Sequence, residues 1–190
     1  METVMKEEFL QQKAKYFKLA GQGAVFIHPT DTIYGIGCDA TNETAVQRIR
    51  GIKQRVSMPF SVIAPSKRWI FENCEVSAEG EKWLEKLPGP FTFIFKLKNK
   101  SAVAAPVTLG GSTLGVRMPK HWILDIAAEL GFPMVSTSAN LTGEQYMTST
   151  EDLDDSIRQK VDFIIYEGEK QGRPSTIVKL FEKEVKVVER

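Results

Sequence analysis

Residues 113–118 read Thr113-Leu114-Gly115-Val116-Arg117-Met118 and lie at the centre of Phe91–Asn140, the segment that decides the fold. Apolar and polar residues alternate here, which predicts a β-strand with Thr113, Gly115 and Arg117 on one face. That face carries a hydroxyl, a bare backbone position and a guanidinium. It suits a carboxylate or a phosphate, because arginine can hold either group through two parallel hydrogen bonds. A surface salt bridge is an equally good interpretation of the arginine from this strand alone.

The rest of the segment leads into a stretch rich in hydroxyl groups. Phe91–Leu97 alternates and predicts a second strand, whereas Lys98–Gly111 is expected to be a mobile loop. Lys120–Leu130 predicts a helix closed by a glycine, and the strand that starts at Pro133–Val135 runs into the loop Ser136–Asn140. Hydroxyls and an amide at a strand end are commonly capping groups. Their density so close to the arginine favours a ligand-binding role.

The upstream part of the chain supplies a second group of polar residues. The short apolar run Ala24–Ile27 predicts a buried strand, and the polar loop Pro29–Gly35 follows it. Gly35 and Gly37 are expected to make this loop tight and to let the backbone approach a ligand. A helix is expected from Thr41 or Asn42 to about Lys53. Lys53 and Arg55 cannot share a helix face, so both reach one ligand only if the helix ends near Gln54. The simpler interpretation is that these cations complement the helix dipole, for ~0.3–1 kcal/mol.

The remaining segments predict further helices and strands. Helices are expected at Lys6–Leu19, Lys67–Asn73, Ser77–Leu87 and, from a start that resembles a capping box, Ser149–Lys160. Strands are expected at Phe60–Ala64, Val161–Tyr166, Ser175–Leu180 and Glu184–Val188, with a polar loop at Gly168–Pro174.

Composition places the chain among globular proteins. Its 190 residues suit one domain, residues 1–190, and the net charge of +1 confines any basic footprint to a local patch. Cys38 and Cys74 suit a reducing compartment, although a single disulfide stays open. The charged start of the chain lacks the apolar core of a signal peptide, and no apolar run reaches membrane-spanning length. We therefore expect a soluble, cytoplasmic protein without a membrane partner.

The candidate functional groups are lysine, arginine, threonine, serine, asparagine and the backbone at glycines. The chain has no Walker A loop, no GxGxxG or HExxH motif and no recognisable Ser-His-Asp set. Its candidate groups bind anions and offer no covalent nucleophile. Chemistry would rest on positioning and on stabilising negative charge, as in nucleotidyl or phosphoryl transfer with Mg²⁺ bridging the phosphates. The residue types alone therefore identify the ligand only as a nucleotide or another small anion.

Six pieces of the sequence, taken in order, resemble the YrdC-like family, the threonylcarbamoyl-AMP synthases. They are Pro29–Ala40, Ile52–Arg55, Pro88–Thr92, Gly115–Pro119, Ser136–Gly143 and Pro174–Val178. Each piece alone is weak evidence, but six in the right order make the assignment strong. The resemblance implies an α/β (α+β) fold, in which helices flank a twisted mixed β-sheet around a concave basic cavity.

The resemblance also implies a reaction. Members of the family combine L-threonine, bicarbonate and ATP into threonylcarbamoyl-AMP and pyrophosphate, with Mg²⁺ expected beside the ATP. A partner transferase then moves the threonylcarbamoyl group to an adenosine beside the anticodon of tRNA. The course implied is carboxylation of the threonine amine, followed by attack of a carbamate oxygen on the α-phosphate.

The family's K-x-R and S-x-N signatures fall within this sequence and imply the ligand-binding residues. The nucleotide would be bound by Lys53, Arg55, Thr113, Ser138 and Asn140. The threonine would be bound by Arg117, which holds its carboxylate, with Thr32, Ser136 and Ser175 around it. The residue types fit these roles, because two anionic ligands meet two cationic clusters and hydroxyls can sense the threonine side chain.

The chain departs from the family pattern in places. Val56 stands where many members have proline, and Phe60 where leucine is usual, but neither change removes a ligand group. The chain ends at Arg190 and so resembles the short, single-domain form. The competing hypothesis is an RNA-binding module that uses the basic cavity for structured RNA. Such binding would weaken steeply with salt, whereas catalytic turnover would depend on threonine.

Overall fold

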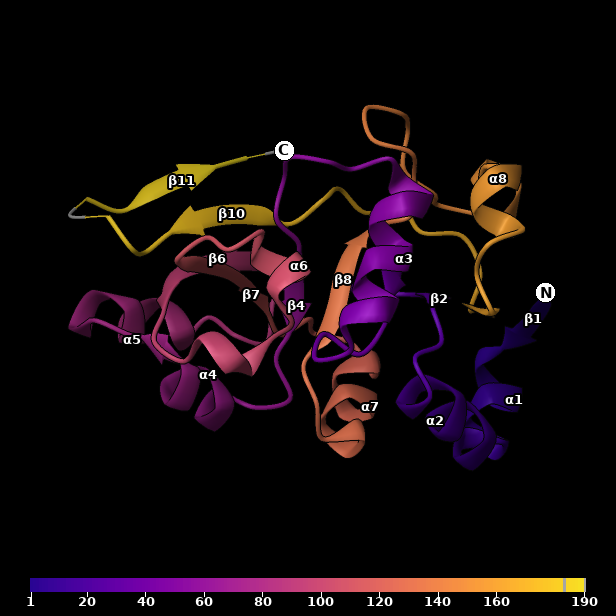
Figure 1. The fold of residues 1–190 in the computed structure, drawn as a ribbon, viewed down its shortest axis with the longest axis horizontal. Coiled ribbons are helices and arrows are strands. Elements are labelled where there is room, and N and C mark those ends of the chain that lie inside the picture. The colour runs from indigo at the N-terminus through magenta and orange to yellow at the C-terminus, as the bar shows by residue number, and fades with distance from the viewer. Residues whose placement is uncertain (183, 190) are drawn as a thin grey trace.

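The computed structural model describes residues 1–182 and 184–189, and the strands within them form one mixed sheet. Its order is β1-β9-β2-β3-β8-β4-β7-β6-β10-β11, with β5 paired to β6 off this path (Figure 1). The strands are β1 (Glu2–Met5), β2 (Phe26–His28), β3 (Gly35–Gly37), β4 (Ser61–Ile63), β5 (Cys74–Glu75), β6 (Phe91–Leu97), β7 (Thr113–Arg117), β8 (Met134–Ser138), β9 (Phe163–Tyr166), β10 (Thr176–Lys179) and β11 (Lys186–Val188).

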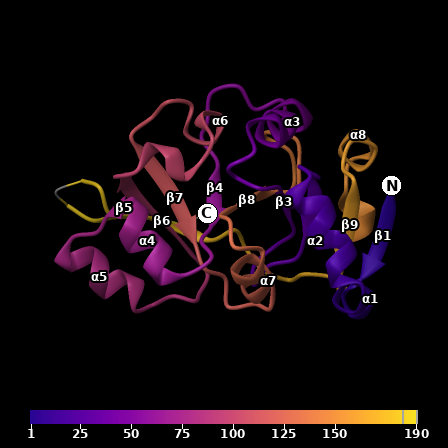
Figure 2. The same cartoon turned by 60° about the horizontal axis from the view of Figure 1, so that its bottom comes forward.

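Helices cover both sides of this sheet. Figure 2 shows α3, α6 and α8 on one side of the strands and α4, α5 and α7 on the other. The helices are α1 (Lys6–Gln11), α2 (Lys13–Gly21), α3 (Glu43–Lys53), α4 (Lys67–Asn73), α5 (Ala78–Leu84), α6 (Ala105–Thr108), α7 (Ile123–Leu130) and α8 (Asp155–Arg158), with 3₁₀ turns η1 (Lys100–Ala102) and η2 (Thr150–Asp152). The predicted fold class, a mixed sheet flanked by helices, is confirmed.

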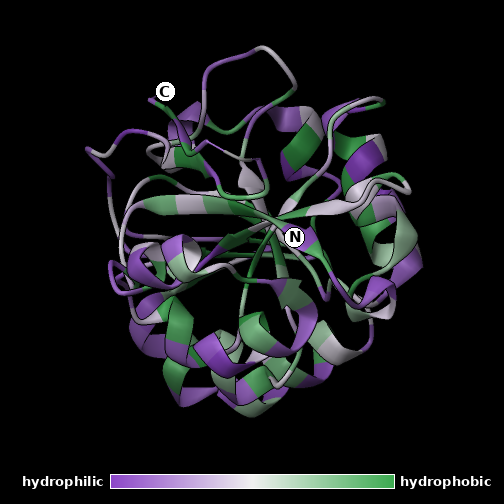
Figure 3. Ribbon diagram, turned by 90° about the vertical axis from the view of Figure 1, so that its left-hand side faces the viewer, coloured by the Kyte–Doolittle hydropathy of each residue, from purple (hydrophilic) through white to green (hydrophobic). Residues whose placement is uncertain are grey.

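Apolar side chains from the strands form the core. Figure 3 shows mainly hydrophobic strands at the centre, with hydrophilic segments on the helices around them. Phe93, Phe95, Val62, Val116 and Val135 are fully buried. Burying a side chain of this size contributes roughly 1.5–3 kcal/mol, so these strands hold the sheet together.

Helix α3 behaves as the sequence predicts. The side chain of Asn42 accepts a hydrogen bond from the amide of Ala45 at 3.0 Å and so caps the first turn. The helix ends at Lys53, because Gln54 adopts a left-handed conformation with φ of 51°. Arg55 therefore lies in the following loop, outside the helix that ends with Lys53.

Three segments predicted as loops contain helices or strands. Lys98–Gly111 contains η1 and α6, so the prediction of a loop throughout this segment is wrong. It is held because the amide of Ala104 donates to Ala40 O at 2.8 Å, and because Val107 is fully buried. Ser136–Ser138 belong to strand β8, and Gly35–Gly37 form strand β3 beside it.

Other predicted boundaries also change. The helix predicted at Lys6–Leu19 is interrupted at Gln12, and a strand, β1, precedes it. The helix predicted over Ser149–Lys160 is two short pieces, η2 and α8, although the capping box between Ser149 and Asp152 is present. The helix predicted over Lys120–Leu130 starts only at Ile123.

Cys38 and Cys74 are both buried and free, so the disulfide left open by the sequence is not formed. Among the described residues, no helix has the length and apolar character that crossing a membrane requires.

Candidate active site

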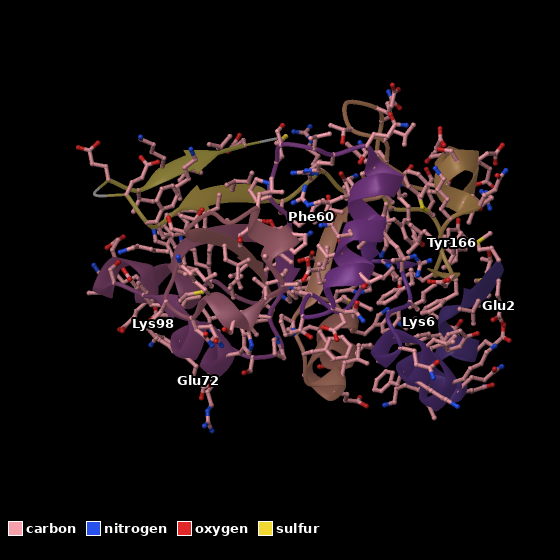
Figure 4. All side chains as sticks on the ribbon, viewed as in Figure 1. Glu2, Lys6, Phe60, Glu72, Lys98 and Tyr166 are labelled. Carbon is pink, nitrogen blue, oxygen red and sulfur yellow. The ribbon has the colours of Figure 1, made fainter. Side chains whose placement is uncertain are left out.

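A cavity of about 110 Å³ opens where strands β3, β8, β4 and β7 lie next to one another. Phe60 forms part of its wall and lies where the loop after α3 returns to the sheet (Figure 4). Two arginines and a series of hydroxyl groups dominate the lining, which comprises Thr30, Ile33, Tyr34, Gly35, Arg55, Pro59, Phe60, Ser61, Thr92, Arg117, Ser136, Thr137, Ser138, Tyr146, Pro174 and Ser175. The cavity is therefore basic, as the resemblance implied.

Arg117 is the buried cation of the cavity, at the carboxyl end of β7. Its side chain is 9% exposed, and its Nη2 donates to Asp31 Oδ1 at 3.2 Å and to Thr32 Oγ1 at 3.1 Å. The second carboxylate oxygen of Asp31 accepts from the amide of Lys120 at 2.9 Å. Asp31 thus fixes the guanidinium in the wall of the cavity. A surface salt bridge, the alternative left open by the sequence, is excluded by this burial.

Hydroxyl groups surround the arginine. Thr30 and Thr32 share a hydrogen bond of 2.9 Å between their Oγ1 atoms, and Thr92 Oγ1 lies 2.6 Å from Ser175 Oγ. Ser136 Oγ is buried and has no hydrogen-bond partner in the part of the chain that the structure describes. An unpaired buried hydroxyl costs about 1–3 kcal/mol, so a ligand that bonds to it would recover this cost.

Strand β7 also contributes a bare backbone position. A Cβ atom at Gly115 would overlap the hydroxyl of Ser61 and lie 3.4 Å from Thr92 Cγ2. Glycine therefore lets the Ser61 and Thr92 side chains approach each other across the floor of the cavity. The sequence indicated a bare backbone position that suits a ligand; in the structure, the nearest groups to it are these two side chains.

Lys53 and the turn after β8 form a compact polar cluster beside the cavity. Lys53 Nζ donates to Ser138 O at 2.5 Å, to Asn140 O at 2.6 Å and to Asn140 Oδ1 at 3.1 Å. Ser138 Oγ donates to the same Oδ1 at 2.5 Å. Burial, and secondarily the charge of Arg55, lower the pKa of Lys53 to about 7. The structure thus brings together the residues of both signatures.

Arg55 reaches the cavity from the loop after α3. Its Nη1 donates to Thr137 Oγ1 at 3.3 Å, and its Nη2 donates to Pro59 O at 2.9 Å. The guanidinium carbon lies 5.3 Å from the ring centre of Phe60, which gives a cation–π contact. Phe60, one of the two residues that depart from the family pattern, thus packs against the guanidinium of Arg55.

Thr113 is separate from the other predicted residues. It lies at the far end of β7, opposite Lys96 of β6, and it is not among the described residues that line the cavity. It shares a face with Gly115 and Arg117, as the alternation predicted, but it lies one step further along that face than Gly115, beyond the cavity.

The polar loop predicted at Gly168–Pro174 belongs to a strap, residues 167–175, whose end lines the cavity. Sequence reasoning missed the cluster that anchors this strap. Glu167 accepts hydrogen bonds from His121 Nε2 at 2.7 Å, from Trp122 Nε1 and from Lys170 Nζ. Burial raises the pKa of Glu167, but these three donors outweigh burial and lower it to about 2. Glu167 is therefore ionised at neutral pH and holds the start of the strap.

The strap then crosses the arginine subsite. A Cβ atom at Gly172 would lie 2.7 Å from the carbonyl carbon of Thr32 and closer still to its oxygen. Pro174 and Ser175 follow and line the cavity. No sequence signal marks the anchoring cluster, because His121 and Glu167 are 46 positions apart.

The fold and the site define a class of protein, an α/β protein with a basic cavity for small anionic ligands. The Sua5/YciO/YrdC family model, whose description is "Telomere recombination", matches residues 18–190. The chain belongs to this family.

Relatives and solved structures agree with this membership. A protein of Methanocaldococcus jannaschii, provisionally named a threonylcarbamoyl-AMP synthase, is 36% identical over 162 residues, which are 83% of this chain and 75% of the relative. The threonylcarbamoyl-AMP synthase of Vibrio vulnificus strain YJ016 is 32% identical over 176 residues, 88% of this chain and 91% of the relative.

Two solved structures are similar along nearly all of the chain. E. coli YciO has a TM-score of 0.86 at 25% identity and covers 100% of this chain and 94% of its own. P. abyssi Sua5, solved in complex with L-threonine, has a TM-score of 0.85 at 29% identity. That match covers 98% of this chain but only 56% of the Sua5 chain.

Proposed function

We propose that this protein is an L-threonylcarbamoyladenylate synthase, a nucleotidyltransferase that forms threonylcarbamoyl-AMP and pyrophosphate from L-threonine, bicarbonate and ATP. The observation that carries the proposal is the cavity in which a buried arginine and an unpaired serine hydroxyl lie beside a second, separate cationic cluster. Membership of the family and the names of its relatives supply the reaction. Residues 1–190 would act as one domain, since all described strands join one sheet.

Arg117 would hold the carboxylate of threonine. Its guanidinium is fixed by Asp31, so little side-chain freedom is lost when the ligand binds. Ser136 and Ser175 line the same cavity, and Thr32 Oγ1 accepts a hydrogen bond from the guanidinium. This geometry would direct the threonine amine and side chain toward the hydroxyls of β8 and the strap.

The phosphates of ATP would bind at the second cluster. Arg55 and Ser138 line the cavity, and Lys53 and Asn140 lie directly behind Ser138. The assignment of Thr113 to the nucleotide stays a prediction. Positive charge and fixed dipoles at this end would stabilise the charge that develops on the α-phosphate and on the departing pyrophosphate.

The reaction needs no covalent bond to the protein. The threonine amine attacks bicarbonate and gives a carbamate with loss of water. A carbamate oxygen then attacks the α-phosphorus, and the bond to the pyrophosphate oxygen breaks. The described residues that line the cavity include no carboxylate, and no group of three or more His, Cys, Asp or Glu side chains suited to a metal occurs among the described residues. Mg²⁺ would therefore enter as part of the substrate, bound to the phosphates of ATP.

The product would be used by a second enzyme. A mixed anhydride of a carbamate and AMP is reactive, so a transferase partner that modifies an adenosine of tRNA would take it over. A cytoplasmic location and contact with tRNA belong to this proposal.

The test is release of pyrophosphate from ATP with Mg²⁺ and bicarbonate, measured with L-threonine, L-serine, L-valine or no amino acid. Release is expected to require threonine, and valine is expected to be a poor substrate because it leaves a hydroxyl of the cavity unpaired. Equal release without any amino acid would mean a nucleotide hydrolase and would refute the proposal. Salt-sensitive RNA binding without any release would support the binding module instead.

A further inference from the structure

Lys53 lies behind the wall of the cavity. It is the last residue of α3, it is 1% exposed, and it is not among the described residues that line the cavity. Its ammonium donates to Ser138 O, Asn140 O and Asn140 Oδ1, at 2.5, 2.6 and 3.1 Å. The three acceptors around Nζ match the three hydrogens of the protonated amine, the form that predominates below the lowered pKa of about 7 and in which the measurements below are made. All three are therefore directed at the turn after β8, and none is directed at the cavity.

These bonds decide which way the carboxamide of Asn140 faces. Lysine only donates, so the amide atom that faces it must be the oxygen. Ser138 Oγ donates to the same oxygen at 2.5 Å, which fixes the orientation a second time. The amide nitrogen consequently faces away from Lys53, where it donates to Glu144 O at 2.7 Å. The backbone amides of Ala139 and Asn140 donate to Tyr34 O and Ser138 O. The donor that this turn can offer to an anion is therefore the second hydrogen of the Asn140 amide nitrogen, on the side away from Lys53.

The backbone of Lys53 holds the same turn from the other side. Its carbonyl oxygen accepts from Thr142 Oγ1 at 2.9 Å and from the amide of Thr142 at 3.3 Å. In the part of the chain that the structure describes, Lys53 forms no ion pair with a carboxylate. A buried ammonium is costly unless its hydrogen bonds are complete, so the turn and the lysine stabilise each other.

Arg55, the second cation of the K-x-R signature, is placed differently. It lines the cavity, and it donates to Thr137 Oγ1 at 3.3 Å from the loop after α3. The left-handed residue Gln54 separates the two cations. Lys53 ends at the backbone of Ser138 and Asn140, whereas Arg55 reaches the hydroxyl of Thr137. The signature therefore contains one cation that faces the ligand site and one that faces the protein.

We propose that Lys53 is a positioning residue, which holds the Ser138–Asn140 turn so that the amide nitrogen of Asn140 is oriented toward the phosphates while Arg55 contacts the nucleotide. Lys53 would thus act through Asn140 and Ser138 and would not itself contact the triphosphate. This inference rests on the proposed function, because it concerns the nucleotide end of the same cavity.

The discriminating variant is Lys53→Arg. A guanidinium binds phosphate at least as well as an ammonium does, so a direct contact would survive the change. A planar fork cannot direct three hydrogens of one nitrogen at three converging oxygens, so the positioning role would be lost. Lys18→Arg is the matched control, since Lys18 is an exposed lysine in the last turn of α2.

Under the proposal, Lys53→Arg raises the KM for ATP about ten- to a hundredfold, while Lys18→Arg leaves it unchanged. The KM for threonine changes much less, which separates lost positioning from general unfolding. An ATP KM within about threefold of the wild type in Lys53→Arg would overturn the proposal, because a generic cation would then suffice.

A second measurement uses the unmodified protein. With ¹⁵N-labelled lysine, the ammonium of Lys53 is expected to be protected from hydrogen exchange without ligand, because its three hydrogens are bonded inside the protein. Addition of ADP is expected to shift the side-chain resonance of Arg55 more than that of Lys53. A rapidly exchanging Lys53 ammonium, or a larger shift of its ¹⁵N resonance on ADP addition, would contradict the inference.

The two measurements also separate this inference from the proposed function. If the wild type releases no pyrophosphate with threonine, the function fails, whereas the protection of the Lys53 ammonium is still tested in the free protein. If the wild type is active and Lys53→Arg binds ATP normally, the function stands and the inference fails.

Discussion

Gly172 of the strap gives the sharpest prediction, because its side chain is excluded by backbone. A Cβ atom there would lie 2.7 Å from the carbonyl carbon of Thr32 and 2.9 Å from its Cα. Non-bonded carbon atoms prefer a separation of ~3.5–4.0 Å. Gly172→Ala must therefore move the strap away from Thr32 by roughly 1 Å, since neither backbone can rotate out of the way.

Two effects follow from this displacement. Overpacking of this kind costs about 1–3 kcal/mol, and for a chain of this length each kcal/mol lowers Tm by about 2–4 °C. Because Ser175 moves with the strap, the KM for threonine is expected to rise about tenfold, and more if the hydroxyl is displaced by a full ångström. The KM for ATP is expected to change little, since the strap lies over the arginine subsite.

Thermal unfolding and threonine-dependent pyrophosphate release measure both effects. Gly51→Ala is the control, because Gly51 is an exposed helical residue of α3 whose Cβ would meet nothing within 4 Å. It should stabilise the protein by roughly 0.5–1 kcal/mol. If Gly172→Ala melts at the wild-type temperature with an unchanged KM for threonine, the strap does not press on Thr32 and the reasoning is refuted.

Three further predictions concern other contacts. Arg117→Lys keeps the charge but loses the fork, so the KM for threonine should rise about ten- to a hundredfold at constant KM for ATP, measured by pyrophosphate release. Glu167 has its pKa lowered from 4.5 to about 2, so its stabilisation is present above pH 4.5 and lost as pH falls toward 2. In urea unfolding, Glu167→Gln should therefore be less stable than the wild type at pH 7, by up to about 3 kcal/mol, with a gap that closes as pH falls. A gap that does not vary with pH would contradict this. Asn42→Ala should lower the free energy of unfolding by about 0.5–2 kcal/mol, because Ala45 loses its cap.

Local signals predicted the elements that local chemistry controls. The cap at Asn42, the end of α3 before Gln54 and the alternation of β6 and β7 all follow from neighbouring residues, and the structure confirms them. The anchoring cluster of the strap could not be predicted, since His121 and Glu167 meet only after β9 and the start of α7 have been placed in the fold. The burial of Arg117 likewise depends on Asp31, which comes from a distant loop.

Strand β3 shows why a correct motif can be given the wrong local structure. Gly35 and Gly37 read as turn residues, because glycine is depleted in strands. In the fold, the ring of His28 lies across them: a Cβ atom at Gly37 would be 2.9 Å from His28 Cδ2, and one at Gly35 would be 3.0 Å from His28 Nε2. Burial lowers the pKa of His28 to about 3, so this ring is neutral at pH 7 and packs without a counter-ion. The two glycines thus let a buried ring lie flat on a strand that pairs with β8. That pairing aligns Gly35 with Ser138. It also places the loop that precedes β3 beside Arg117, which donates to Thr32 Oγ1.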